Sequence, residues 1–276
     1  MGLADNKVAF ISGVARGQGR SHAVRLAEEG ADIIGFDICA NDNAVEYPLA
    51  TPDDLEETAS LIEKFGRKAI LEVADVRDYD AVRRVVDNGV AELGRLDIVL
   101  ANAGVMAITG KHRLRREAWF AGIDIMLNGV FNTVEAALPH VKAGGRGGSI
   151  VITSSTAGLT GGLSDGSPGI QGYIAAKHGV VGLMRGWANC LAPENIRVNT
   201  VHPTGVNSPM VANEAFARFV QEYPEVAGIL QNPLPVPNGL LEPEDVTNSI
   251  MHLISDAGKF ITGSTFTVDA GFSNRA

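Results

Sequence analysis

Tyr173 and Lys177 lie four residues apart, in a stretch whose apolar residues recur at helical spacing. On a helix, side chains at positions i and i+4 share one face, so the phenol and the ammonium would be neighbours. A free tyrosine has a pKa of about 10, and a nearby cation favours the phenolate and lowers that value. The pair could therefore take a proton from an alcohol near neutral pH. Because the same spacing also arises by chance on many helices, the surrounding elements have to support this reading.

A glycine-rich turn follows the first apolar run of the chain, Val8–Ser12. Glycines occupy positions 13, 17 and 19, and a helical pattern follows directly, which predicts strand, turn and helix. Such a turn lets the backbone approach a pyrophosphate, whose charge the N–H groups and dipole of the helix N-terminus stabilise. The arrangement predicts a dinucleotide site, although three glycines also occur in purely structural turns.

Asp37 ends the second predicted strand, residues 31–37, 18 positions after Gly19. A carboxylate there can accept hydrogen bonds from both hydroxyls of an adenosine ribose and would repel a 2′-phosphate, which favours NAD over NADP. Arg16 is a competing signal, because a basic side chain in this turn could bind that phosphate. We expect the Asp37 carboxylate to determine the cofactor preference, in favour of NAD. The alternative interpretation is that Asp37 is a solvated aspartate in a turn.

The composition limits the classes of partner and the compartment. The 276 residues carry a formal net charge of −9 and no basic run, which argues against nucleic acid and anionic membranes. The two cysteines, Cys39 and Cys190, lie far apart without a His/Cys cluster, so neither a disulfide framework nor a metal site is predicted. No apolar run approaches the roughly 20 residues of a membrane helix, and no signal peptide is recognisable. We expect a soluble, cytoplasmic protein.

Strand and helix patterns alternate along the whole chain. The predicted strands cover residues 8–12, 31–37, 69–74, 96–101, 149–153, 196–202 and 264–269. Helices are predicted from about residue 22 and over 53–65, 78–93, 116–141, 173–193 and 242–256. This order predicts an α/β fold with a parallel sheet, helices on both faces and a site at the carboxyl ends of the strands.

The serine pair Ser154-Ser155 upstream of Tyr-x-x-x-Lys, the G-x-x-x-G-x-G turn and the sequence Asn102-Ala103-Gly104 after the fourth strand together resemble the short-chain dehydrogenase/reductase family. The resemblance covers essentially the whole chain. It implies one domain, residues 1–276, with a Rossmann-type, doubly wound parallel sheet of about seven strands. It also implies an NAD-dependent enzyme that interconverts a secondary alcohol and its ketone.

The resemblance assigns roles to individual residues. Tyr173 would act as the base, Lys177 would lower its pKa, Ser155 would hold the substrate oxygen and Asn128 would relay protons through water. The implied cofactor-binding residues are Gly13, Arg16, Gly17, Gln18, Gly19, Asp37, Ile38, Asp75, Val76, Asn102, Ala103, Gly104, Tyr173, Lys177, Pro203, Val206 and Ser208. His202, at the end of the sixth strand, is interpreted as structural.

Three segments depart from the family's usual pattern. Residues 39–52 look like an insertion at the adenosine end, and residues 208–237 would form a cap over the substrate. The glycine-containing loop before Tyr173 is several residues longer than usual; it leaves the register of the serine open and is expected to belong to the substrate pocket.

These departures are similar to those of the carveol dehydrogenase subgroup, which is associated with the redox carrier mycofactocin and holds NAD tightly. That similarity implies a small apolar substrate such as a terpenoid alcohol, a mycofactocin-type electron acceptor and a homotetramer. Two alternatives stay open: an NADPH-dependent 3-oxoacyl or ketosteroid reductase, and a non-catalytic NAD sensor.

Overall fold

The computed structural model describes residues 2–161, 164–224 and 231–274. Among these residues, seven parallel strands form one sheet in the order β3-β2-β1-β4-β5-β6-β7. The strands are β1 (Val8–Ser12), β2 (Asp32–Asp37), β3 (Ala69–Val73), β4 (Ile98–Ala101), β5 (Gly148–Thr153), β6 (Ile196–Pro203) and β7 (Thr265–Val268). The predicted α/β class and the alternation of elements are confirmed.

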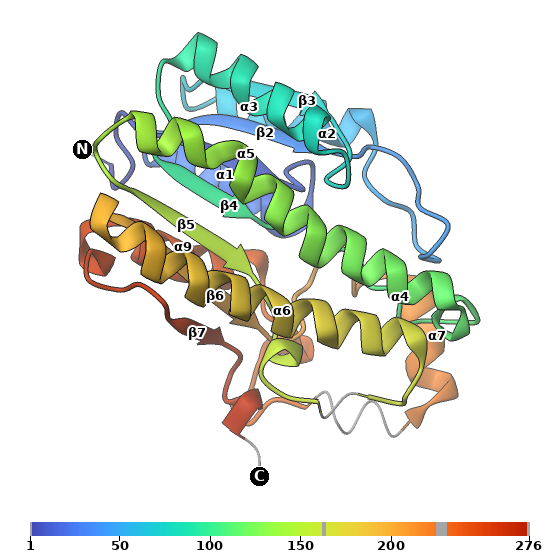
Figure 1. Ribbon diagram of the computed structural model, residues 1–276. Coiled ribbons are helices and arrows are strands. Elements are labelled where there is room, and N and C mark those ends of the chain that lie inside the picture. The colour runs from blue at the N-terminus through green and yellow to red at the C-terminus, as the bar shows by residue number, and fades with distance from the viewer. Residues whose placement is uncertain (1, 162–163, 225–230, 275–276) are drawn as a thin grey trace.

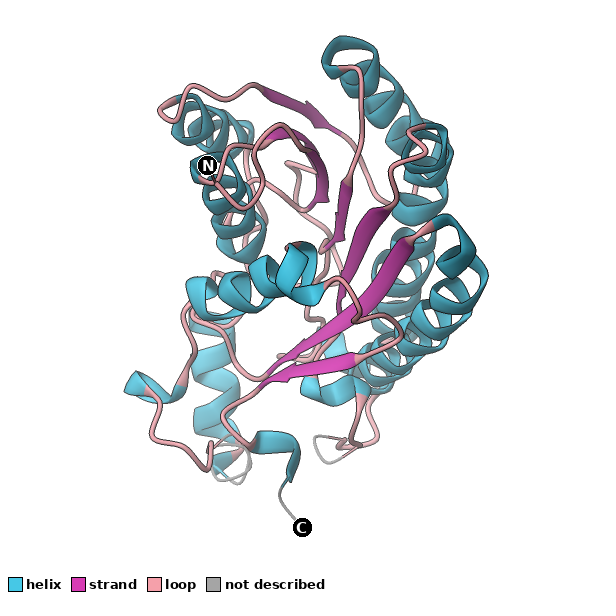
Figure 2. Cartoon of the chain, turned by 90° about the vertical axis from the view of Figure 1, so that its left-hand side faces the viewer, coloured by secondary structure: helices cyan, strands magenta, loops and turns pink. Residues whose placement is uncertain are grey.

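Helices cover both faces of the sheet, as Figures 1 and 2 show. They are α1 (Gly17–Glu28), α2 (Pro52–Glu63), α3 (Tyr79–Leu93), α4 (Arg116–Ile123), α5 (Gly129–Ala143), α6 (Pro168–Leu191), α7 (Glu214–Glu222) and α9 (Pro243–Ile254). Helices α3, α5 and α6 share one apolar core with one face of the sheet, and α1, α2 and α9 share the other.

Strand β1 illustrates why the sheet is covered on both sides. Its side chains alternate between the two cores, with Val8 and Phe10 in the first and Ala9 and Ile11 in the second. All four are buried. A strand that is apolar on both faces can be stable only between two layers, which is why the helices have to lie on both sides.

The start of α2 is set by its own sequence. The Thr51 side chain accepts the N–H of Asp54, and the Asp54 carboxylate accepts the N–H of Thr51, while Pro52 occupies the first turn. This reciprocal cap and the proline are typical helix-start signals. They end the irregular segment 39–52, which runs from the end of β2 to this helix.

Helix α6 begins at Pro168, five residues earlier than the sequence predicts. A proline is favoured in the first turn of a helix. A Cβ on Gly169 would collide with the carbonyl oxygen of Ala107, and one on Gly172 would crowd the backbone of Trp119. Two glycines expected in a substrate loop therefore serve close packing of α6 against neighbouring segments.

The single helix predicted over 116–141 is also divided. Helix α4 is followed by a π-helical turn, Asp124–Asn128, before α5 begins at Gly129. Such turns insert a residue into the α-helical repeat and often lie at functional sites.

The carboxyl ends of the parallel strands lie at one edge, where loops carry most of the predicted site residues. Strands β2 and β3 lie on one side of β1, and β4 to β7 lie on the other. The strand order therefore reverses at β1, and ligands of open α/β sheets bind at the carboxyl ends of the strands at such a point. Among the described residues, no helix is long and apolar enough to cross a membrane.

Candidate active site

The glycine-rich turn between β1 and α1 forms one wall of a cavity at this edge, here called the turn cavity. Gly13 has φ +71°, a conformation that favours glycine. A Cβ on Gly19 would collide with the carbonyl oxygen of Gly13, so the tight turn requires glycine there. Helix α1 begins at Gly17, and its first N–H groups therefore face this cavity without intrahelical partners.

Asp37 lies at the end of β2 on the wall of the turn cavity. Its Oδ2 accepts the backbone N–H of Ala15 at 3.1 Å. Burial raises the pKa of this carboxyl, while hydrogen bonds from backbone N–H groups oppose the rise. The guanidinium of Arg16 donates to the carbonyl oxygen of Pro48 at 2.7 Å, so the basic side chain is bound to the 39–52 segment.

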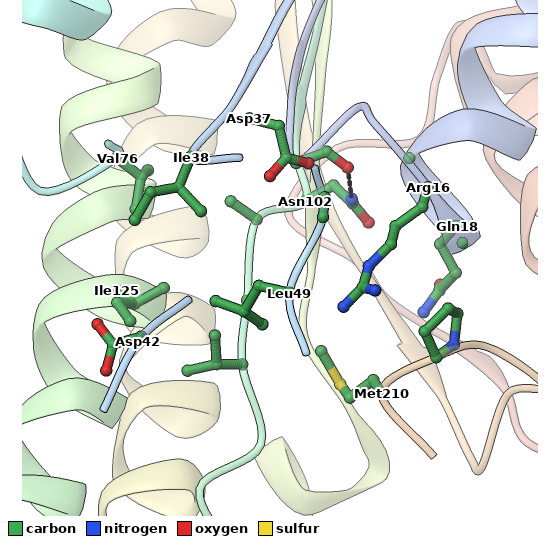
Figure 3. A pocket seen from close by; sticks show the side chains of 18 of the residues that line it. Arg16, Gln18, Asp37, Ile38, Asp42, Leu49, Val76, Asn102, Ile125 and Met210 are labelled. Carbon is green, nitrogen blue, oxygen red and sulfur yellow. Dashed lines mark hydrogen bonds between the residues drawn. The ribbon is translucent and has the colours of Figure 1, made fainter. Parts of the chain in front are cut away.

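The 39–52 segment forms much of the opposite wall. Asp42, Tyr47, Leu49 and Ala50 line the turn cavity, and Figure 3 shows Leu49 and Arg16 pointing into the same space. We did not identify these four as site residues from the sequence. The sequence signal that could have identified them is the position of the segment, directly after the strand that ends in Asp37.

A second cavity, here called the tyrosine cavity, adjoins the first. The two share Gln18, Asn102, Gly104, Ser208 and Met210 as lining residues. The predicted cofactor-binding residues divide between the cavities without exception. Tyr173, Lys177, Pro203 and Val206 line only the tyrosine cavity, Gln18, Asn102, Gly104 and Ser208 line both, and the others line only the turn cavity.

Three of the predicted catalytic residues meet in the tyrosine cavity. Tyr173 and Lys177 both lie on α6, and Lys177 Nζ is 5.7 Å from the centroid of the Tyr173 ring. Lys177 is buried, and its ammonium donates to the carbonyl oxygen of Thr153 at 2.7 Å. The Ser155 hydroxyl lies close enough to the Tyr173 phenol to favour the phenolate, which acts to lower the pKa of Tyr173.

The contacts of Ser154 and Ser155 distinguish the two serines of the pair. The Ser154 hydroxyl donates to the carbonyl oxygen of Lys177 at 2.9 Å and is buried. Ser155 instead reaches Tyr173 and lines the tyrosine cavity. The first serine therefore fixes α6 to the end of β5, and the second is available for chemistry.

The residues of the two cavities fit a dinucleotide. The turn excludes side chains where a pyrophosphate would lie, and the first N–H groups of α1 can accept negative charge. Asp37 supplies a carboxylate at the far end. Gln18 Oε1 is buried at the junction and has no hydrogen-bond partner among the described residues, so a ligand could supply one.

Comparisons with known proteins agree with this geometry. Residues 13–273 match a family model described as enoyl-(acyl carrier protein) reductase. A (-)-trans-carveol dehydrogenase from Rhodococcus erythropolis is 48% identical over 280 residues, covering 98% of this chain and 99% of the relative. The chain belongs to the short-chain dehydrogenase/reductase family.

Two further members of the family extend the comparison. The crystal structure of carveol dehydrogenase from Mycobacterium avium in complex with NAD has a TM-score of 0.91 to this chain and 46% identity, with 100% of each chain covered. A cyclohexanol dehydrogenase from an Acinetobacter species is 32% identical, over 98% of this chain and 96% of the relative. The similarity therefore extends over the whole fold.

The pKa values of Tyr173 and Lys177 differ from those predicted for the two residues on an isolated helix. Burial raises the pKa of Tyr173, and only the hydrogen bond from Ser155 opposes the rise. Burial also lowers the pKa of Lys177 to about 8. Because removal from water penalises both charged forms, the pKa of Tyr173 is not lowered by the protein residues alone, which corrects the prediction.

The structure does not bring Asn128 into the site. This residue is exposed, and its Nδ2 donates to Asp124 Oδ1 at 3.0 Å. Met126, two positions earlier, is buried and lines the tyrosine cavity. Residues two apart on a helix face different directions, which agrees with the buried position of Met126 and the exposed position of Asn128. The relay role that the family resemblance implies for Asn128 stays a prediction, and its side chain does not line either cavity.

His202 lies behind Ser155, as expected for a structural residue. It is fully buried, its Nδ1 is 2.8 Å from the carbonyl oxygen of Ser155, and its Nε2 is 2.7 Å from the hydroxyl of Thr200. A carbonyl can only accept, so Nδ1 carries the proton. Burial lowers the pKa of His202 to about 4, which keeps the ring neutral near pH 7.

Most of the remaining wall of the tyrosine cavity is apolar, although Thr156 and Thr204 also line it. It includes Met106, Ile108, Met126, Ala157, Ile170, Ile174, Met210, Val211, Phe216, Leu240 and Phe272. Tyr173 and Lys177 are the ionisable residues among the described residues that line it. These apolar residues come from segments far apart in sequence, so no local pattern identified them as a set.

The segment predicted as a cap, 208–237, contributes part of this wall. Ser208 and Met210 line both cavities, and Phe216 on α7 lines the tyrosine cavity. Residues 225–230 of the predicted cap lie outside the described residues. Within the described residues, no group of three or more His, Cys, Asp or Glu side chains could hold a metal ion.

Proposed function

We propose that this protein is an NAD-dependent oxidoreductase that interconverts a neutral, apolar secondary alcohol and its ketone. The observation that carries the proposal is the cluster of Ser155, Tyr173 and Lys177 in a largely apolar cavity that adjoins the glycine-lined turn cavity. The names of the relatives, carveol dehydrogenase and cyclohexanol dehydrogenase, support an alicyclic alcohol.

NAD, when bound, supplies the hydride acceptor that oxidation of an alcohol requires. Tyr173 accepts the hydroxyl proton of the alcohol, and Ser155 donates a hydrogen bond to the same oxygen. The Lys177 ammonium stabilises the phenolate before transfer. The apolar wall excludes water from the reacting atoms and orients a substrate that carries no charge.

The preference for NAD over NADP rests on Asp37 and on the bond between Arg16 and Pro48. A 2′-phosphate near the Asp37 carboxylate would be repelled, and Arg16 is already bound to a backbone carbonyl. The complex of the Mycobacterium avium relative with NAD supports the same choice. A direct comparison of NADH and NADPH binding tests it, and tighter NADPH binding would favour the alternative of an NADPH-dependent 3-oxoacyl or ketosteroid reductase.

The finer proposal is a terpenoid alcohol such as carveol, with NAD retained between turnovers and reoxidised by a mycofactocin-type acceptor. The 39–52 segment supports retention, because it is tied across the turn cavity by Arg16 and by Arg77, whose guanidinium binds Asp42 at 2.9 Å and Asp75 at 2.6 Å. Residues 39–52 as an insertion and 208–237 as a cap belong to the same proposal.

A cytoplasmic homotetramer is also proposed, as the family resemblance implies. Phe131 on α5 is 45% exposed and stacks on Trp187 of α6 at 6.1 Å between ring centroids. Single exposed apolar side chains are common on protein surfaces, so the proposal rests on the family resemblance.

The test of the proposed function uses the full-length protein as purified. Mass spectrometry of the denatured protein measures retained NAD, and a panel of alcohols is then assayed with NAD⁺ and with an artificial electron acceptor. We expect turnover of apolar alicyclic alcohols, and loss of at least 100-fold in kcat, about the contribution of a general base, for Tyr173→Phe with unchanged NAD binding. Retained turnover in that variant would reject the assignment of Tyr173, and NAD binding without turnover of any alcohol would favour a sensor.

A further inference from the structure

Tyr47 stands between the two cavities. Its side chain lines the turn cavity and is only 5% exposed. Its hydroxyl oxygen accepts the backbone N–H of Met106 at 2.9 Å. Met106 lines the tyrosine cavity and is 7% exposed. One hydrogen bond therefore connects the 39–52 segment with the wall of the tyrosine cavity.

A second bond joins the 39–52 segment to the short turn His112–Leu114, which follows the 102–108 segment. His112 Nδ1 is 2.9 Å from the carbonyl oxygen of Asn43, and a carbonyl can only accept, so the ring donates. Residues 102–108 have no helix or strand of their own. The path of this segment, which carries Met106 and Ile108, consequently depends on hydrogen bonds made by other segments.

We propose that Tyr47 is a positioning residue that holds Met106, and with it the width of the tyrosine cavity. The inference rests on the proposed function, because it assigns that cavity to the substrate. The 39–52 segment also lines the turn cavity through Asp42, Leu49 and Ala50. Tyr47 therefore contacts the turn cavity with its ring and holds a residue of the tyrosine cavity with its hydroxyl.

The hydroxyl oxygen of Tyr47 is the atom that holds the backbone of Met106. Tyr47→Phe keeps the buried ring but leaves the Met106 N–H without its partner. A buried donor without a partner is costly, so residues around Met106 have to move until that N–H reaches water or another acceptor. The ring contacts with the turn cavity stay in place, so cofactor binding should change little.

Steady-state kinetics of Tyr47→Phe with NAD⁺ and an apolar alicyclic alcohol test this role. We expect the KM for the alcohol to rise about fivefold to tenfold, the effect of one hydrogen bond, with kcat and the Kd for NAD changed less than twofold. The matched control is Tyr79→Phe, which removes the hydroxyl of an exposed tyrosine at the start of α3. A weaker Kd for NAD with an unchanged KM would overturn the proposal, because Tyr47 would then serve the cofactor alone.

A double-mutant cycle shows whether Tyr47 acts through Met106. Met106→Ala removes most of the side chain that forms the wall, and the effects of Tyr47→Phe and Met106→Ala on KM should then be strongly non-additive. Additive effects would reject the connection between the two residues.

Hydrogen exchange provides a readout that does not need turnover. In the protein with bound NAD, a peptide covering residues 102–110 should exchange faster in Tyr47→Phe than in the wild type and in Tyr79→Phe. Unchanged exchange would contradict the inference even if the enzyme is active. Absence of alcohol turnover in the wild type would instead reject the proposed function, while the exchange experiment would still decide the role of Tyr47.

Discussion

His202 shows how a residue that contacts no ligand can shape the chemistry. Its imidazole holds the carbonyl oxygen of Ser155 from behind, and Thr200 holds the opposite ring nitrogen. The orientation of the Ser155 hydroxyl toward Tyr173 depends on the backbone that this histidine supports. His202 is therefore a positioning residue for Ser155 and not a second base.

Replacing His202 tests this role at the residue scale. In His202→Leu the Ser155 carbonyl loses its donor, and we expect kcat to fall about tenfold, the effect of roughly one lost hydrogen bond of 1–1.5 kcal/mol. His202→Asn can donate from its amide nitrogen and should recover part of the loss. The measurement is kcat and KM for the same alcohol in both variants; equal activity of His202→Leu and the wild type would show that Ser155 needs no support.

At the scale of elements, Arg113 joins three segments around the tyrosine cavity. Its guanidinium lies over the rings of Phe219 and Tyr223, 5.4 and 4.8 Å from their centroids, and its Nε is 3.1 Å from Asp165 Oδ2. Phe219 belongs to α7, the helix whose Phe216 lines the cavity. Arg113 thereby connects α7 with the segment that precedes α6.

We predict that Arg113→Leu loosens α7 over the cavity. Each cation–π contact contributes about 0.5–2 kcal/mol, so the KM for an apolar alcohol should rise about tenfold, while kcat changes less. Limited proteolysis should cut residues 210–224 faster than in the wild type.

The matched control for this prediction is Arg116→Leu. Arg116 is exposed and also lies over an aromatic ring, that of Phe120 at 5.1 Å, but neither residue lines a cavity. A similar rise in KM for both variants would mean that loss of a surface charge, and not release of α7, causes the effect.

At the scale of the whole molecule, two fully buried histidines make stability depend on pH. Burial lowers the pKa of His22 to about 3 and that of His202 to about 4. His22 Nδ1 is bonded to Thr247 on α9, and its Nε2 is buried with no partner among the described residues. Protonation would place an unsatisfied charge between α1 and α9.

The sign of the pH dependence follows from these pKa values. An unfolded histidine has a pKa of about 6.5, so below that pH the unfolded chain binds protons that the folded chain excludes. The contribution of each neutral, buried histidine to the free energy of unfolding is fully present above pH 6.5. It is lost as the pH falls toward 4 for His202 and toward 3 for His22, at up to about 1.4 kcal/mol per pH unit for each histidine. Urea unfolding at pH 7.5, 6 and 5 should show a smaller decline for His22→Gln than for the wild type. Parallel curves for the two proteins would contradict a role for His22.

Much of the fold and of the turn cavity could be predicted from the sequence because the signals are local. The strands and helices follow from the spacing of apolar residues, and the turn from glycines, of which Gly13 and Gly17 have positive φ. Tyr173 and Lys177 share one helix, so their four-residue spacing alone places them together. Asp37 is the last residue of its strand, which brings it to the carboxyl edge of the sheet.

Tertiary structure decided the features that depend on contacts between distant segments. Ser154 and Ser155 are equivalent by type, and only the contact of one with α6 and of the other with Tyr173 separates them. A π-helical turn, which no local pattern indicated, divides the predicted helix 116–141, with Met126 buried and Asn128 exposed. The raised pKa of Tyr173 arises from burial, which depends on the whole fold and not on the four-residue spacing to Lys177.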